Sequence, residues 1–218
     1  MGAVSAREQV VEAARSFSAA GLTIATWGNI SLRSGESVFI TPSGMDYAAL
    51  LPEDITEVAL ADGRVLSGGR RPSTETALHL AVYAARPEAG AIVHTHAVES
   101  TAFAVTGRTV PVVTDEAAQV LRGEVRTAEY ALPGTAELAA NCVSALGESS
   151  MACLLRAHGA VCLGESLQRA LLCARVLEQT CEIYRLALSL GGPAEAFPQE
   201  RIEKMTVFLQ KSYGQKQY

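Results

Sequence analysis

The stretch Ala91-Ile92-Val93-His94-Thr95-His96-Ala97 decides the fold prediction for this chain. Its first three residues are apolar and two of them are β-branched, which is typical of a buried strand. Side chains on a strand alternate between its two faces, so His94 and His96 leave the backbone on the same face. Two imidazoles on one face can bind one metal ion, and zinc or another divalent first-row ion is expected. The alternative is that both histidines only form local hydrogen bonds at the end of the strand.

A third histidine ends a second apolar run. His158 lies within Leu154-Leu155-Arg156-Ala157-His158-Gly159-Ala160-Val161, and the chain has only four histidines. A protein with few histidines that places three of them at the ends of buried runs is expected to be a metal enzyme. Cysteine ligands are not expected, because the five cysteines have apolar neighbours and form no C-x-x-C pair. They are predicted to be reduced core thiols: Cys142, Cys153, Cys162, Cys173 and Cys181.

The composition predicts one globular domain spanning residues 1–218. The chain is 49% apolar with a net charge of −5, and no linker or repeat divides it. It has no basic block, so neither nucleic acid nor a membrane surface is an expected partner. The N-terminus lacks the apolar core of a signal peptide, so a cytoplasmic location is expected. The polar C-terminal tail, residues 211–218, is expected to be mobile.

Helices and short strands alternate along the chain. Ser5 with Glu8 predicts a capping box at the start of the first helix. Strands are predicted in hairpins at residues 28–41 and around Asp62-Gly63, and in a short piece at Val110–Thr114. Later helices are predicted at 136–146, 166–190 and 199–210. Short strands joined mainly by hairpins, with helices between them, imply an α/β fold with a largely antiparallel sheet.

Three short segments combine glycine, small polar side chains and exposed backbone N–H groups. Such segments can form a concave anion site without any lysine, although each could also be an ordinary turn. None matches the glycine-rich phosphate loop of nucleotide enzymes, so neither ATP nor a dinucleotide is expected. The segments are Gly28-Asn29, Ser43-Gly44 and, after Gly68-Gly69, Ser73-Thr74.

A further helix is predicted after Arg71-Pro72. Ser73 or Thr74 is its predicted N-cap, which places Glu75 in the first turn, where an acid most often only interacts favourably with the helix dipole. His79 lies one helical turn later on the same face. We expect His79 to pack beneath Glu75 or to support it.

Five motifs follow one another along the chain: Thr26-Trp27-Gly28-Asn29-Ile30-Ser31, Ile40-Thr41-Pro42-Ser43-Gly44, Pro72-Ser73-Thr74-Glu75, His94-Thr95-His96 and Arg156-Ala157-His158-Gly159-Ala160-Val161. Together they resemble the class II aldolase/adducin family, near its L-fuculose-1-phosphate aldolase branch. The similarity covers essentially the whole chain. It implies a three-layer α/β/α domain with a central, mostly antiparallel sheet. It also implies a cyclic homotetramer with active sites between subunits.

The resemblance implies a site and a reaction. By motif match, His94, His96 and His158 would bind zinc, and Glu75 would be a mobile fourth ligand and the acid/base. The substrate would be a phosphorylated sugar, L-fuculose 1-phosphate or a related 5-deoxy-ketose 1-phosphate. An aldolase would cleave it to dihydroxyacetone phosphate and an aldehyde, with zinc stabilising the charge that develops beside the ketone. The implied phosphate ligands are Gly28, Asn29, Ser43, Gly44, Ser73 and Thr74.

One departure concerns the aldehyde end of the substrate. In the family's fuculose aldolase, a tyrosine from the neighbouring subunit follows a Val-Pro-x-Val strand. Here Val110-Pro111-Val112-Val113 is followed by Thr114-Asp115-Glu116. Asp115 is therefore the candidate catalytic group at this place. L-fuculose 1-phosphate, a related 5-deoxy-ketose 1-phosphate and a differently substituted ketose phosphate all stay open.

Two other activities in the family use the same zinc and phosphate site, a ribulose-phosphate 4-epimerase and a methylthioribulose-phosphate dehydratase. The epimerase branch typically has aspartate where this chain has Glu75, which favours the aldolase, whereas Asp115 favours the epimerase. A non-enzymatic, adducin-like module has lost its metal ligands. It is not expected here, because the three histidines and the acid are all present.

Overall fold

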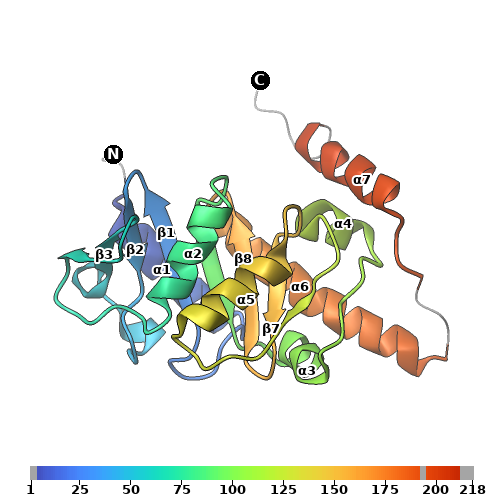
Figure 1. Cartoon of the computed structure of the whole chain (residues 1–218), viewed down its shortest axis with the longest axis horizontal. Helices are drawn as coiled ribbons and strands as arrows, with labels where there is room; N and C mark the ends of the chain where they lie inside the picture. The colour runs from blue at the N-terminus through green and yellow to red at the C-terminus, as the bar shows by residue number, and fades with distance from the viewer. Residues whose placement is uncertain (1–3, 192–194, 212–218) are drawn as a thin grey trace.

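A computed structural model describes residues 4–191 and 195–211 of the chain (Figure 1). Except for Lys211, the tail predicted to be mobile lies outside the described residues. Within the described part, one eight-stranded sheet has the order β4-β3-β2-β1-β5-β8-β7-β6, and only β6 and β7 run parallel. The predicted α/β fold with a largely antiparallel sheet is confirmed. The strands are β1 (Asn29–Ser34), β2 (Ser37–Ile40), β3 (Thr56–Ala59), β4 (Val65–Ser67), β5 (Ala91–Thr95), β6 (Thr127–Ala128), β7 (Ala152–Leu155) and β8 (Gly159–Gly164).

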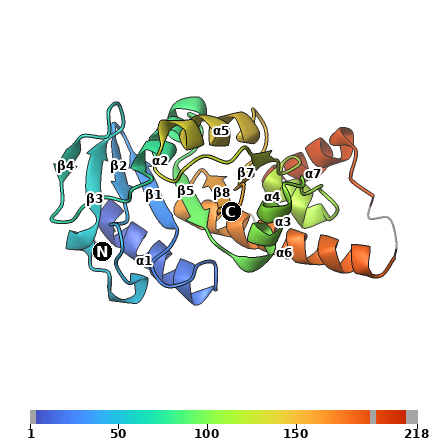
Figure 2. The same ribbon diagram turned by 60° about the horizontal axis from the view of Figure 1, so that its bottom comes forward.

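Helices cover both faces of the sheet and complete three layers. Figures 1 and 2 show α2 and α5 together on one face and α1 and α6 on the other, while α4 and α7 pack together at one end. The predicted capping box is present at α1, where the Glu8 N–H donates to Ser5 Oγ over 3.3 Å. The helices are α1 (Ala6–Ala19), α2 (Thr76–Ala85), α3 (Val98–Thr106), α4 (Asp115–Leu121), α5 (Ala136–Leu146), α6 (Leu167–Ser189) and α7 (Gln199–Lys211), with 3-10 turns η1 (Tyr47–Ala49) and η2 (Pro52–Asp54).

The central strands β5 and β8 bring the ends of distant segments together. Every residue of β5 and of β8 is buried, as expected for apolar strands covered on both faces. In the register, His94 lies opposite Asn29 on β1 and opposite Val161 on β8. The strands approach closely at this end, because a Cβ added to Gly159 would lie 2.2 Å from the carbonyl oxygen of Thr95. The end of β5 therefore meets the start of β1 and the start of β8.

The strand predicted at Val110–Thr114 is wrong. Only Val110 pairs there, through an isolated bridge with Val125. The next ladder bonds would belong to Val112, but its carbonyl oxygen accepts from the N–H of Phe197 over 2.7 Å, so the pairing does not extend into a ladder. The two-residue β6, which pairs in parallel with β7, was not predicted.

The five cysteines are buried free thiols, as their apolar neighbours predicted. Among the described residues, no helix is long and apolar enough to cross a membrane.

Candidate active site

Three histidines converge where β5 and β7 end and β8 begins. His94 is on β5, His96 follows the last residue of that strand, and His158 lies in the turn between β7 and β8. One ring nitrogen of each lies within 4.8 Å of the other two. The Nε2 atoms of His94 and His96 are 3.1 Å apart, close to the roughly 3.3 Å between two nitrogen ligands of a tetrahedral zinc ion. The strand period of two and the order of the strands thus bring all three imidazoles together.

Their hydrogen bonds and protonation suit a ligand role. His94 donates from Nδ1 to the carbonyl oxygen of Ala160 over 2.9 Å, which leaves Nε2 facing the other rings. Burial, together with the charge of His94, lowers the pKa of His96 to about 3 and that of His158 to about 4. Both are therefore neutral at pH 7, and a neutral imidazole has the lone pair that a metal needs.

Glu75 is the N-cap of α2, not a residue of its first turn, so the predicted cap at Ser73 or Thr74 is wrong. The reason is a tight turn before the helix, in which the N–H of Glu75 donates to Ser73 Oγ over 3.2 Å. The carboxylate therefore turns toward the histidines. Its Oε2 lies 3.2 Å from His94 Nε2 and its Oε1 lies 3.7 Å from His158 Nε2.

The same contacts set the charges of this pair. Burial alone would raise the pKa of Glu75, but the charges of His94 and His158 and hydrogen bonds from His94 and Asn29 hold it well below its usual range. Burial alone would lower the pKa of His94, but the charge and hydrogen bond of Glu75 and the bond to Ala160 raise it. Glu75 is therefore an anion when it faces the histidines.

The donor set fits a divalent metal. Glu75 Oε1 is buried and finds no hydrogen-bond donor among the described residues. An anionic oxygen left in this state beside converging imidazoles is costly, and a cation between them would satisfy it. Three imidazole nitrogens and a carboxylate oxygen are ligands typical of zinc.

A cavity of about 420 Å³ opens beside Glu75, His96 and His158. All six residues predicted to bind phosphate line it, and none of its described lining residues is lysine or arginine. In the part of the chain that the structure describes, the N–H groups of Gly44 and Thr74 have no acceptor, so they are available to a ligand. The lining is Thr26, Trp27, Gly28, Asn29, Pro42, Ser43, Gly44, Ser73, Thr74, Glu75, His96, Pro133 and His158.

Gly28 is required by the way β1 begins next to the histidines. Its φ is +76°, and an added Cβ would lie 2.5 Å from the carbonyl oxygen of His94. A residue with a side chain would be strained there and would also push β1 away from β5. Gly28 therefore allows this part of the cavity lining to lie against the histidine strand.

Asn29 joins the cavity to the acid. Its Nδ2 donates to Glu75 Oε2 over 2.9 Å, and its Oδ1 contacts His79 Nε2. Burial lowers the pKa of His79 to about 3, so its imidazole is neutral. His79 thus supports Glu75 as expected, but it does so through Asn29 and not by direct side-chain contact.

Asp115 is not brought to this site within one chain. It is the first residue of α4, its side chain is 51% exposed, and it pairs with Arg201 of α7 at 3.1 Å. Its catalytic role stays a prediction that requires a neighbouring subunit.

Trp27 is a cavity residue to which the sequence assigned no role. The residue is 60% exposed, and its indole stacks on the His96 ring, with centroids 6.1 Å apart and planes at 27°. The available signal was a large aromatic residue directly before Gly28 in a loop. Thr26 and Pro133 also line the cavity without having been predicted.

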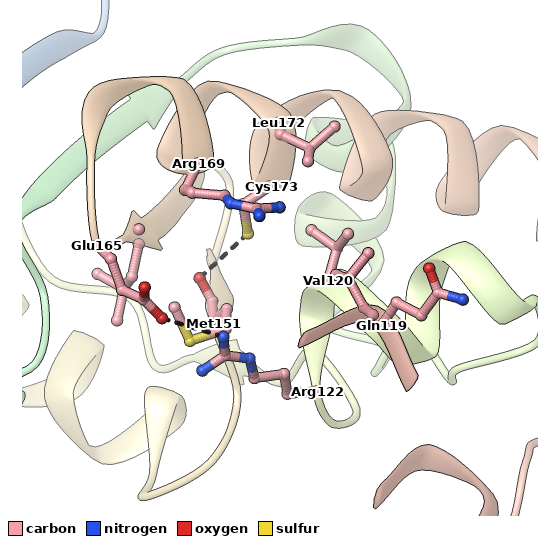
Figure 3. A pocket seen from close by; sticks show the side chains of 11 residues that line it. Gln119, Val120, Arg122, Met151, Glu165, Arg169, Leu172 and Cys173 are labelled. Carbon is pink, nitrogen blue, oxygen red and sulfur yellow. Dashed lines mark hydrogen bonds and ion pairs between the residues drawn. The ribbon is translucent and has the colours of Figure 1, made fainter. Parts of the chain in front are cut away.

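A second hollow lies between α4, α6 and β8 (Figure 3). It holds about 80 Å³, its described lining has no histidine, and Arg122 there pairs with Glu165 at 3.3 Å. Figure 3 also shows the thiol of Cys173 directed at Met151. This volume suits a few water molecules rather than a sugar phosphate, so the histidine cavity is the candidate active site.

Comparison with known proteins agrees with this geometry. The model of the family "Class II Aldolase and Adducin N-terminal domain" matches residues 8–185. The chain therefore belongs to the class II aldolase/adducin family. A 5-methylthioribulose-1-phosphate/5-deoxyribulose-1-phosphate aldolase of Rhodospirillum rubrum is 36% identical over 211 residues, 97% of this chain and 93% of that protein.

Two further relatives belong to the fuculose branch. The L-fuculose phosphate aldolase of Escherichia coli K12 is 32% identical over 209 residues, 94% of each protein. The solved structure of an L-fuculose 1-phosphate aldolase matches with a TM-score of 0.89 and 30% identity, over 96% of this chain and 98% of that one. The fold is therefore that of the class II aldolases.

Proposed function

We propose that this protein is a zinc-dependent class II aldolase, a carbon–carbon lyase that cleaves a ketose 1-phosphate to dihydroxyacetone phosphate and an aldehyde. The observation that carries the proposal is the cavity itself. It places three imidazoles and the Glu75 carboxylate beside loops of small residues that carry free N–H groups. The names of relatives in two branches, deoxyribulose-phosphate and fuculose-phosphate aldolases, support the same reaction class.

His94, His96 and His158 would hold the metal, with Glu75 as a fourth, displaceable ligand. A divalent ion bound there, zinc first among the candidates, supplies Lewis-acid stabilisation of the negative charge that develops when the carbon–carbon bond breaks. The Glu75 carboxylate, which lines the cavity, would move the proton as acid/base. Its position as N-cap lets the side chain rotate without disturbing the helix.

The phosphate would be bound by neutral donors. Gly44 and Thr74 supply backbone N–H groups, and Ser43, Ser73 and Thr74 supply hydroxyls. Asn29 has a second Nδ2 hydrogen besides the one given to Glu75. Gly28 would contribute by letting the loop approach closely. The proposed metal-binding and phosphate-binding groups share one cavity, which supports a substrate that carries both a ketone and a phosphate.

We further propose a single domain over residues 1–218 and a cyclic homotetramer in which Asp115 of one subunit enters the site of the next. One continuous cluster of buried apolar side chains supports the single domain. Apolar side chains left exposed on α3 and near the end of α6 support association. They include Val98 (69% exposed), Val105 (64%), Leu186 (45%) and Leu190 (87%).

The test is a screen of metal-loaded protein with 5-deoxyribulose 1-phosphate, 5-methylthioribulose 1-phosphate and L-fuculose 1-phosphate. Release of dihydroxyacetone phosphate, epimerisation and loss of water are assayed separately. We expect release of dihydroxyacetone phosphate from at least one substrate, and no release of dihydroxyacetone from the same sugar without phosphate. Epimerisation or dehydration without this release would replace the aldolase by one of the other family activities.

A further inference from the structure

Three buried polar side chains play no part in the proposed reaction, although they extend from the candidate active site into the core. Ser31 lies in the middle of β1, and His79 and Tyr83 lie on α2. Their exposed fractions are 0%, 0% and 1%. A serine in the centre of a sheet and a histidine in the core both cost free energy unless they are hydrogen-bonded.

These side chains form one buried hydrogen-bond chain with the site. Glu75, His79 and Tyr83 follow at intervals of four on one face of α2, and Asn29 and Ser31 follow at an interval of two on one face of β1. Along the hydrogen-bond chain, residues of α2 alternate with residues of β1. Ser31 Oγ lies 2.8 Å from the Tyr83 hydroxyl and 2.7 Å from His79 Nδ1, and His79 Nε2 contacts Asn29 Oδ1. Asn29 Nδ2 completes the chain at Glu75 Oε2, 2.9 Å away.

The carboxylate fixes the direction of every bond in this chain. An ionised Glu75 only accepts, so Asn29 must present its NH2 group to it and its oxygen to His79. That oxygen requires a proton on His79 Nε2. The ring nitrogens of His79 face a hydroxyl and an amide instead of a carboxylate, so the imidazole is neutral and Nδ1 accepts. Ser31 therefore donates to His79 Nδ1 and accepts from Tyr83.

We propose that Ser31 and His79 are positioning residues for the aldol cleavage: they hold the Asn29 amide with its NH2 group toward Glu75. The inference rests on the proposed function, because it assigns Asn29 and Glu75 to the substrate. Without a donor on His79 Nε2, the amide is free to turn, and its oxygen would then face the carboxylate and repel it. The chain thus keeps Glu75 at the cavity and leaves the second Nδ2 hydrogen of Asn29 for a ligand.

Tyr83 provides the matched control. Ser31→Ala removes the donor to His79 Nδ1, so the imidazole can take the other tautomer and the Asn29 amide can turn. Tyr83→Phe removes a hydroxyl one step further away, and Ser31 still donates to His79. Both variants lose one buried hydroxyl, but only Ser31→Ala allows the donors and acceptors of the hydrogen-bond chain to reverse.

The first experiment is steady-state kinetics of the zinc-loaded variants with the best ketose 1-phosphate. We expect Ser31→Ala to lose on the order of 10- to 100-fold in kcat, the scale of a small misplacement of a reacting group, with a smaller change in KM. Tyr83→Phe should stay within about threefold of the wild type, because the direction of the chain is intact. Equal losses of kcat in the two variants would overturn the proposal.

The second experiment does not depend on activity. In ¹⁵N spectra of the zinc-loaded protein, the Asn29 side-chain amide is assigned by its loss in Asn29→Asp. Wild type and Tyr83→Phe should show one sharp, slowly exchanging Asn29 NH2 pair and a His79 ring protonated at Nε2. Ser31→Ala should broaden or shift both signals, and unchanged signals would contradict the proposal. Since this holds whichever sugar is cleaved, a failed substrate screen and a failed positioning role are distinguishable.

A second pair of variants covers the case in which Ser31→Ala does not fold. His79→Gln keeps an N–H donor that can reach Asn29 Oδ1, whereas His79→Leu fills similar space without one. We expect His79→Gln to retain at least tenfold more kcat than His79→Leu. The same kcat in both would show that no donor to Asn29 is needed, and the positioning role would be abandoned.

Discussion

Glu75 makes the largest number of contacts among the proposed catalytic groups, since its carboxylate contacts two imidazoles and an amide. Glu75→Gln should retain zinc, because three histidines and a water molecule complete the coordination. It should lose on the order of 10²- to 10⁴-fold in kcat, the usual range for a general acid–base group. Metal analysis and release of dihydroxyacetone phosphate measure the two effects.

A half-reaction separates proton transfer from bond cleavage. Glu75→Gln should fail to exchange the carbon-bound proton of dihydroxyacetone phosphate with solvent, a step that needs no aldehyde. Exchange at the wild-type rate would place the base elsewhere. Loss of zinc together with activity would make Glu75 an obligatory metal ligand.

Thr74 gives the cleanest test of the phosphate loops. Gly28 cannot be replaced without a clash against β5, and Asn29 also bonds to Glu75, so changes at either residue affect more than phosphate. Thr74→Val is nearly isosteric, and the side chain is exposed in the cavity. Loss of one hydrogen bond to an anion should raise KM by roughly tenfold with little change in kcat. With an unphosphorylated ketose, wild type and Thr74→Val should have the same kinetic constants. An unchanged KM for the phosphorylated substrate would show that the Thr74 hydroxyl does not bind the phosphate.

At this scale the sequence predicted which residues would come together. Alternation placed His94 and His96 on one face, and glycines and small polar residues marked six residues that line the cavity, whose role toward phosphate stays a prediction. Ser31 and Tyr83 were missed because each looks ordinary on its own. The signal is that polar side chains two residues apart on β1 face polar side chains four residues apart on α2. It becomes visible only when that helix is known to lie on that strand.

Among the elements, the contact between β5 and β8 holds the histidines together. Gly159→Ala should force these strands apart, because its Cβ would lie 2.2 Å from the Thr95 carbonyl oxygen and 3.4 Å from a ring carbon of His94. We expect a loss of about 1–3 kcal/mol in the free energy of unfolding and at least tenfold weaker zinc binding, the scale of a perturbed ligand support. Urea denaturation and competitive chelation provide the measurements.

Gly69→Ala is the matched control for this prediction, since nothing lies within 4 Å of its added Cβ and its φ is not in the left-handed region. It should leave both stability and zinc affinity nearly unchanged. If Gly159→Ala behaved like Gly69→Ala, the close approach of β5 and β8 would not be what sets the histidine geometry.

The elements also mark where sequence reasoning ends. Helices with clear caps and apolar faces were predicted within a residue or two, as for α5 and α6. The strand predicted at Val110–Thr114 failed, because apolar β-branched composition does not reveal that the Val112 carbonyl bonds to Phe197 and the pairing stops after one bridge. Nor could alternation alone give the order β5-β8-β7, which is what brings His158 to the other two histidines.

For the whole molecule, the proposed tetrameric ring makes it possible to test whether Asp115 acts in the site of a neighbouring subunit. Light scattering should give four times the 23.0 kDa chain mass. Asp115→Ala and Glu75→Gln should each be nearly inactive, but tetramers that contain both should regain activity, because some sites then combine an intact Glu75 with a neighbour's intact Asp115. A fully active monomer would rule out the shared site.

Arg201→Ala controls for the ion pair that Asp115→Ala also breaks. It should remain active, since Asp115 itself is retained. Absence of recovery in mixed tetramers of confirmed composition would mean that Asp115 does not act in a neighbour's site.

The position of Glu75 directly after Ser73 and Thr74 has one more consequence. Consecutive Cα atoms are about 3.8 Å apart across a trans peptide bond whatever happens elsewhere in a protein. The backbone spacing between Thr74, a proposed phosphate ligand, and Glu75, the proposed acid/base, is therefore set by covalent structure and not by the packing of the sheet. Substitutions that weaken distant parts of the core should reduce the fraction of folded enzyme. The regioselectivity of the remaining enzyme, its preference for a phosphate on carbon 1 over carbon 5, should stay the same.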